Sequence, residues 1–123
     1  MGNLVFNPVS ALTGATLEEM ATHPEAAQLA RSVMQEADTV AEALGVKMPV
    51  SIDRRMVGAE KVGAHKTSML QDLEMGRPME LGALVGAVVE LGEMLNVPMP
   101  YTRSVYACAK LLSDVRGSRA SGS

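Results

Sequence analysis

Aromatic residues are scarce in this sequence: Phe6, Tyr101 and Tyr106 are the only three among 123 residues, and tryptophan is absent. Runs of β-branched or aromatic residues at a period of two are also missing, which argues against a strand-based fold. The apolar content, 47% of the chain, comes instead from Ala, Leu, Val and ten Met residues. Because good helix formers dominate, the composition predicts an all-α protein.

Cysteine is rarer still. The single Cys108 excludes an internal disulfide, and such low cysteine use is expected of a protein in a reducing compartment. Cys108 falls within an apolar helical pattern, so we predict a small core residue rather than a nucleophile. No apolar run approaches roughly 18 residues, and no basic segment followed by an apolar stretch opens the chain. We therefore expect a cytoplasmic protein with no membrane association.

Positive charge is not in excess, since 11 Lys and Arg residues stand against 14 Asp and Glu residues and give a net charge of −3. This balance argues against nucleic acid as a partner. One group of cations is interspersed with acidic residues: Arg54, Arg55, Lys61 and Lys66 occur with Asp53 and Glu60. Such mixed charge favours a solvated helix face over an anion site.

The common cofactor motifs are missing too. The sequence has no G-x-G-x-x-G, no Walker loop, no C-x-x-C and no H-E-x-x-H. With only His23 and His65, we expect no His-based metal site.

Capping residues, prolines and glycines divide the chain into helical segments of one domain, residues 1–116. The expected segments are 3–13, a short helix opened by the capping box at 16–19, 24–44, 51–62, a short segment ending at Gly76, 78–96 and about 101–115. On the 78–96 helix the residues expected to face inward are Leu81, Leu84, Val85, Val88, Leu91 and Leu95. On the last helix they are Val105, Cys108, Leu111, Leu112 and Val115. Residues 117–123 are predicted to be a flexible tail.

Two of these helices contain residues that are unusual in a helix interior. Pro8 leaves two alternatives for the first segment: a kinked helix, or a helix that begins at Pro8 and is capped by Asn7. Gly82, Gly86 and Gly92 weaken their helix by roughly 1 kcal/mol each relative to Ala. That cost suggests that another backbone packs closely against it.

A set of polar residues brackets the apolar segments and could bind a small polar acid: Asn3, Asn7, Ser68, Asp72 and Glu80. Amides and hydroxyls donate hydrogen bonds to a carboxylate, and a glutamate accepts one from a hydroxyl. Each residue also has a structural explanation. An Asn before Pro and a Ser before a helix are ordinary turn and cap residues, and Glu80 would interact favourably with a helix dipole. Asp72 could simply form an ion pair with Arg77 or Lys66.

Three stretches together resemble a known family. They are NPVSALTGATL at 7–17, HKTSMLQDLEMGRPMEL at 65–81, and LVGAVVELGEMLNVPMPYTRSVYACAKLL at 84–112. In this order they resemble the C-terminal domain of ketopantoate reductase (2-dehydropantoate 2-reductase), and SMLQD followed by GRPxE is the most specific part. The resemblance implies a compact multi-helix domain of the ketopantoate reductase and 6-phosphogluconate dehydrogenase C-terminal type.

The resemblance also implies roles for individual residues. Asn3 and Asn7 would line the ketopantoate site, Ser68 would hydrogen-bond the substrate, and Glu80 would contact the substrate or the cofactor. Asp72 matches a recurrent family aspartate that we interpret as structural. His65 stands where some family members carry a substrate-side asparagine.

The family reduces ketopantoate to pantoate, on the route to pantothenate and coenzyme A, with NADPH bound by an N-terminal Rossmann domain. That domain has no counterpart in these 123 residues. The family's general-acid lysine lies one helical turn before the position of Asn3, and so upstream of Met1. We therefore expect a substrate-binding and dimerisation domain, a homodimer that pairs with a Rossmann domain and is inactive alone. The alternatives are a non-enzymatic helical oligomerisation or interaction module, and a reductase of another 2-keto acid.

Overall fold

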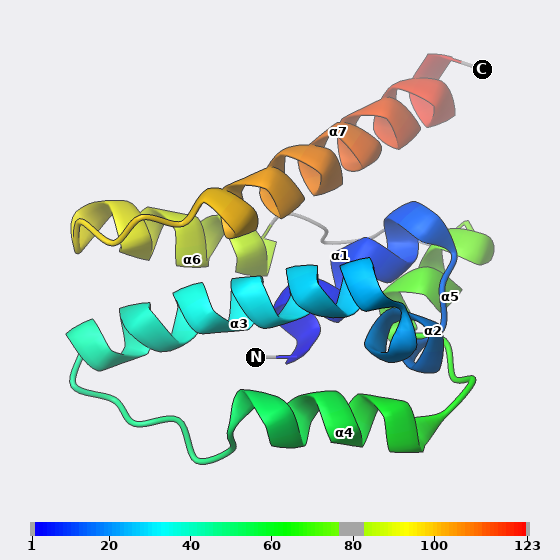
Figure 1. The fold of residues 1–123 in the computed structure, drawn as a ribbon. Coiled ribbons are helices and arrows are strands. Elements are labelled where there is room, and N and C mark those ends of the chain that lie inside the picture. The colour runs from blue at the N-terminus through cyan, green and yellow to red at the C-terminus, as the bar shows by residue number, and fades with distance from the viewer. Residues whose placement is uncertain (1, 77–82, 123) are drawn as a thin grey trace.

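The protein is an all-α domain whose helices pack around one long central helix (Figure 1). The computed structural model describes the backbone of residues 2–76 and 83–122 and the side chains of residues 4–76 and 85–116. The helices in these ranges are α1 (Gly2–Thr13), α2 (Leu17–Thr22), α3 (Pro24–Ala43), α4 (Ile52–Val62), α5 (Ser68–Glu74), α6 (Ala83–Met94) and α7 (Pro100–Gly122). The all-α prediction is confirmed. None of these helices combines the length and apolarity needed to cross a bilayer.

Helix α3 organises the domain because it packs against α1, α2, α4, α6 and α7. In Figure 1 it lies between α4 on one side and the α6–α7 pair on the other. Its buried face carries small and medium side chains, Ala30, Val33, Met34 and Ala37. Small residues on this face let neighbouring helices approach closely. The main core continues from this face into α1, α4, α6 and α7.

The predicted helix boundaries are confirmed where the sequence has strong caps. Thr16 and Glu19 form the predicted capping box, Pro24 opens α3, and Ser51 caps α4 by accepting from the Arg54 N–H at 3.2 Å. Asn96 adopts a φ of 57°, the left-handed conformation of a helix C-terminal cap. Short-range hydrogen bonding determines these positions, so the sequence is sufficient to locate them.

Helix α1 resolves one of the open alternatives. It runs without interruption from Gly2 to Thr13 with Pro8 inside, so Asn7 lies within the helix and does not cap it. Pro8 cannot donate to the carbonyl of Leu4, which normally costs several kcal/mol of helix stability. Its side chain is fully buried, and this packing offsets part of that cost.

The buried face of α7 differs from the prediction. Cys108 is exposed and Leu111 is 63% exposed, so both were wrongly assigned to the core, whereas Thr102, Val105 and Ala109 are buried. The buried carboxylate of Glu36 on α3 explains this rotation. It accepts from the N–H of Tyr101 at 3.0 Å, the N–H of Thr102 at 2.7 Å and the Thr102 hydroxyl at 2.6 Å. These bonds turn Thr102 inward and satisfy N–H groups at the start of α7.

One prediction about α6 needs correction. Leu91, expected to be buried, is 37% exposed, whereas Val85, also expected to be buried, and Val89 are buried. The backbone of residues 117–122 continues helix α7, and the predicted flexibility of residues 117–123 stays a prediction.

The glycines of α6 accommodate mainly side chains. A Cβ at Gly92 would clash with the Sδ of Met99, and a Cβ at Gly86 would lie 3.0 Å from the Cε1 of Tyr106. The predicted close backbone is wrong at Gly86, where a side chain fills the space. At Gly92 it holds in part, because the carbonyl of Val97 would lie 3.3 Å from the added Cβ. Gly82 lies outside the described residues.

Replacing the buried carboxylate of Glu36 should destabilise the domain strongly. Glu36→Ala leaves the Thr102 hydroxyl and two N–H groups at the start of α7 without partners, so we expect a loss of about 3 kcal/mol. The free energy of urea-induced unfolding measures it. Glu42→Ala removes an exposed carboxylate from the same helix and is the control, with an expected change within about 0.5 kcal/mol. Equal losses in the two variants would contradict the capping role of Glu36.

The capping box should make stability depend on pH. Hydrogen bonds from the backbone N–H and the hydroxyl of Thr16 lower the pKa of Glu19 below its ordinary value of 4.5. A lowered folded-state pKa means that the contribution is fully present above pH 4.5 and is lost as pH falls through the folded value. The difference in unfolding free energy between wild type and Glu19→Gln should therefore shrink in acid. A difference that stays constant from pH 7 to pH 3 would refute this.

Candidate functional site

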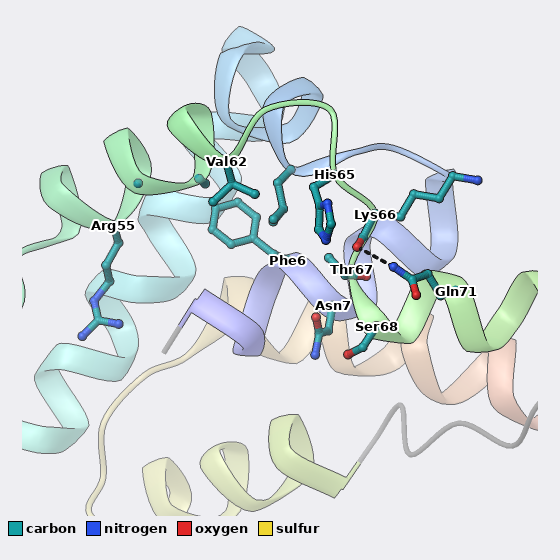
Figure 2. Close-up of a pocket in the computed structure, with 12 residues that line it drawn as sticks. Phe6, Asn7, Arg55, Val62, His65, Lys66, Thr67, Ser68 and Gln71 are labelled. Atoms are coloured by element: carbon teal, nitrogen blue, oxygen red, sulfur yellow. Dashed lines mark hydrogen bonds between the residues drawn. The ribbon is translucent and has the colours of Figure 1, made fainter.

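A cavity of about 460 Å³ opens between α1, α4 and the segment that leads into α5 (Figure 2). Its lining residues are Phe6, Asn7, Leu17, Arg55, Gly58, Ala59, Val62, His65, Lys66, Thr67, Ser68 and Gln71. Aliphatic and aromatic side chains form its middle, and polar side chains lie at its edges. A mostly apolar cavity with a few polar groups is typical of a site for a small ligand.

The cavity brings together two of the predicted site residues. Asn7 comes from the middle of α1 and Ser68 is the first residue of α5, and Figure 2 shows their side chains next to each other. The side chain of Asn3 and the whole of Glu80 lie outside the described residues, so their predicted roles stay predictions. His65 lines the same cavity.

A chain of hydroxyl groups joins α1 to α5 directly behind these two residues. The Oγ of Ser10 and the Oγ1 of Thr67 lie 2.5 Å apart, and both residues are buried. Ser10 donates to the carbonyl of Asn7 at 2.9 Å, so Thr67 must be the donor to Ser10. Thr67 in turn accepts from the N–H of Leu70 at 3.1 Å as the N-cap of α5. Every hydroxyl in this chain is satisfied as both donor and acceptor.

Sequence reasoning missed Thr67 and assigned the helix cap to its neighbour Ser68. Thr67 is the cap, which leaves the exposed hydroxyl of Ser68 available at the cavity. The sequence did contain a signal for this cap. Thr67 is a preferred N-cap residue three positions before Leu70, and its hydroxyl accepts a hydrogen bond from the N–H of Leu70. Its contact with Ser10 is long-range, and no local pattern predicts that.

Backbone hydrogen bonds fix the loop that carries His65. The N–H of Leu17 donates to the carbonyl of His65 at 3.0 Å, and the N–H of Glu18 donates to the carbonyl of Gly63 at 3.1 Å. The first turn of α2 thus holds this wall of the cavity in place. Lys66 follows His65 in this loop, and its carbonyl accepts a hydrogen bond from the side chain of Gln71 at 3.2 Å (dashed in Figure 2).

The charged residues of the cavity are cationic. Arg55 and Lys66 line it, and no carboxylate does so among the residues that the structure describes. Lys66 is neutralised by Glu74, whose two carboxylate oxygens lie 2.7 and 3.0 Å from Nζ. The cations predicted to form one solvated face are therefore divided: Arg54 and Lys61 are exposed and lie outside this cavity. In the described part of the chain, no group of His, Cys, Asp and Glu side chains could hold a metal ion.

An all-α domain with a cavity of this kind is suited to bind a small anionic ligand. Comparisons of the chain with known proteins identify its family. Residues 1–113 match the family model described as the C-terminal domain of ketopantoate reductase PanE/ApbA. The chain is 53% identical over 116 residues to the 2-dehydropantoate 2-reductase of Mesorhizobium japonicum, covering 94% of this chain and 36% of that protein. The chain belongs to the ketopantoate reductase family.

Solved structures agree with this assignment. The 2-dehydropantoate 2-reductase of Methylococcus capsulatus has a TM-score of 0.81 at 38% identity, covering 93% of this chain and 40% of that one. The dimeric ketopantoate reductase of Staphylococcus aureus shares the fold, with a TM-score of 0.74 at 24% identity, covering 94% of this chain and 41% of that one. This chain therefore spans about two fifths or less of each of these relatives.

Breaking the hydroxyl chain should destabilise the domain and uncouple α1 from α5. Thr67→Ala removes a helix cap and leaves the buried Ser10 hydroxyl without its donor, so we expect a loss of about 2 kcal/mol in unfolding free energy. Thr67→Ser should lose less than about 1 kcal/mol because its hydroxyl is retained. A double-mutant cycle with Ser10→Ala should give a coupling energy of about 1 kcal/mol.

The control for this cycle is Thr39→Ala, which removes an exposed hydroxyl that donates to the carbonyl of Gln35 within α3. We expect a change within about 0.5 kcal/mol. Additive effects of Ser10→Ala and Thr67→Ala would show that the two hydroxyls do not interact in solution.

Proposed function

We propose that this chain is the substrate-binding domain of an NADPH-dependent 2-dehydropantoate 2-reductase, which reduces ketopantoate to pantoate. The observation that carries the proposal is the shared position of Asn7 and Ser68 at one cavity whose charged lining residues, among those described, are cationic. Family membership supplies the reaction, because the named relatives are ketopantoate reductases. The ligand would be a 2-keto acid, an anion of a size that this cavity admits.

Each polar residue has a role in this proposal. The Asn7 amide and the Ser68 hydroxyl donate hydrogen bonds to the substrate. As the family resemblance implies, Asn3 would add a contact with the substrate, and Glu80 would contact the substrate or the cofactor. Asp72, a partly buried residue of α5, has a structural role.

The hydride and the proton come from elsewhere in this proposal. Reduction of a ketone needs a hydride donor and an acid beside the developing alkoxide. The 123 residues contain no glycine-rich dinucleotide motif. A Rossmann domain of a longer enzyme would bind the cofactor, and a lysine ahead of Asn3 would be the acid. The 123-residue chain by itself should bind ketopantoate without reducing it.

A homodimer is part of the proposal. The Staphylococcus aureus relative is dimeric, and α7 exposes the apolar Leu111 and Tyr101 at 63% and 50% of their surface. A dimer contact on α7 would bury these two side chains. The same surface supports the second candidate, a non-enzymatic interaction module, and ligand binding separates the two. A module would give a dimer by light scattering without binding a keto acid.

Calorimetric titration of the purified chain with ketopantoate tests the substrate role. We expect saturable binding that Asn7→Ala and Ser68→Ala each weaken by about tenfold, because each removes a hydrogen bond to a charged group. Ser104→Ala, an exposed serine of α7 whose hydroxyl donates to the carbonyl of Pro100, should bind like wild type. The absence of binding, or NADPH oxidation above a blank without protein, would count against the proposal.

A further inference from the structure

We infer that Arg55 is the residue that selects anionic substrates at this cavity. The inference rests on the proposed function and assigns a role to a residue outside the predicted site. Asn7 and Ser68 are neutral donors, so they hydrogen-bond a carboxylate, a ketone or a neutral amide alike. A preference for an acid over its uncharged analogue requires a cation within reach.

Among the lysine and arginine residues that line the cavity in the described part of the chain, Arg55 is the better placed to supply that charge. Lys66 is held by both oxygens of Glu74, and this ion pair cancels most of its field. Arg55 has no carboxylate partner in the described part of the chain. Its Nε donates to the carbonyl of Val50 at 3.4 Å, a long bond that a ligand can displace. The guanidinium also keeps its charge at every physiological pH.

The position of Arg55 fits this role. It projects from α4 at the opposite end of the cavity from Asn7 and Ser68, and the side chains of Phe6 and Val62 lie between these ends (Figure 2). Arg55 is partly buried, so solvent screens its charge less than that of the exposed Arg54. Binding to a planar carboxylate by two N–H groups is what an arginine does better than a lysine.

The adjacent Arg54 provides a matched control. It lies on the same helix and has the same charge, but its exposed side chain does not line this cavity. Arg55→Gln and Arg54→Gln therefore change the net charge of the protein equally. Any difference between them reports on the cavity rather than on the charge of the whole protein.

The experiment measures the Kd of ketopantoate and of its uncharged primary amide by calorimetry for wild type, Arg55→Gln, Arg55→Lys and Arg54→Gln. We expect Arg55→Gln to weaken ketopantoate binding about tenfold while the Kd of the amide changes less than about twofold. Arg55→Lys should retain part of the affinity, and Arg54→Gln should match wild type. Added salt should weaken wild-type binding more than that of Arg55→Gln.

Other results would overturn the inference, beginning with an Arg55→Gln variant that binds ketopantoate like wild type. If the amide loses as much affinity as the acid, Arg55 only maintains the shape of the cavity and the inference is wrong. If Arg54→Gln loses as much as Arg55→Gln, the effect belongs to net charge and the inference is also wrong. In both cases wild type still binds ketopantoate, so the proposed function stands. A wild-type chain that binds no ketopantoate overturns the proposed function and the inference with it.

Discussion

The site depends on one contact between two buried hydroxyl groups, those of Ser10 and Thr67. Each belongs to a residue that already has a local task, since Ser10 donates to the carbonyl of Asn7 and Thr67 caps α5. Their contact ties the backbone at Asn7 to the start of the helix that presents Ser68. A buried network in which every donor and acceptor is satisfied stabilises a single arrangement, because any shift leaves a polar group unpaired.

Glu36 has a comparable role in the other half of the domain. A carboxylate that is 9% exposed is costly to bury unless it is well hydrogen-bonded, and the first turn of α7 supplies three donors. The contact determines which face of α7 meets α3. The apolar pattern of α7 alone allowed another rotation, in which Cys108 and Leu111 would be buried. Here a polar interaction between distant residues decided the packing of an apolar helix.

The parts of the fold that the sequence could predict are those controlled by local chemistry. Local interactions between residues a few positions apart determine the helix ends. Examples are the caps at Thr16 and Ser51, the start of α3 at Pro24 and the end of α6 near Asn96. Asn7 and Ser68 belong to the polar set that the sequence suggests, the family resemblance implies their roles, and the structure brings them to one cavity. Other features depend on contacts between distant segments, which periodicity does not encode. They are the inward face of α7, the contact of Thr67 with Ser10, and the fact that Arg55 lines the cavity while Arg54 does not.

Main-chain hydrogen bonds from Leu17 and Glu18 attach the loop that carries His65 to the first turn of α2. These bonds do not involve the side chain at position 65. A substitution of His65 leaves them intact, so the neighbouring Thr67 and Ser68 should keep their places. Position 65 is therefore a place where the cavity lining can be redesigned with little effect on the scaffold, whereas Ser10 and Thr67 hold the scaffold together through their side chains.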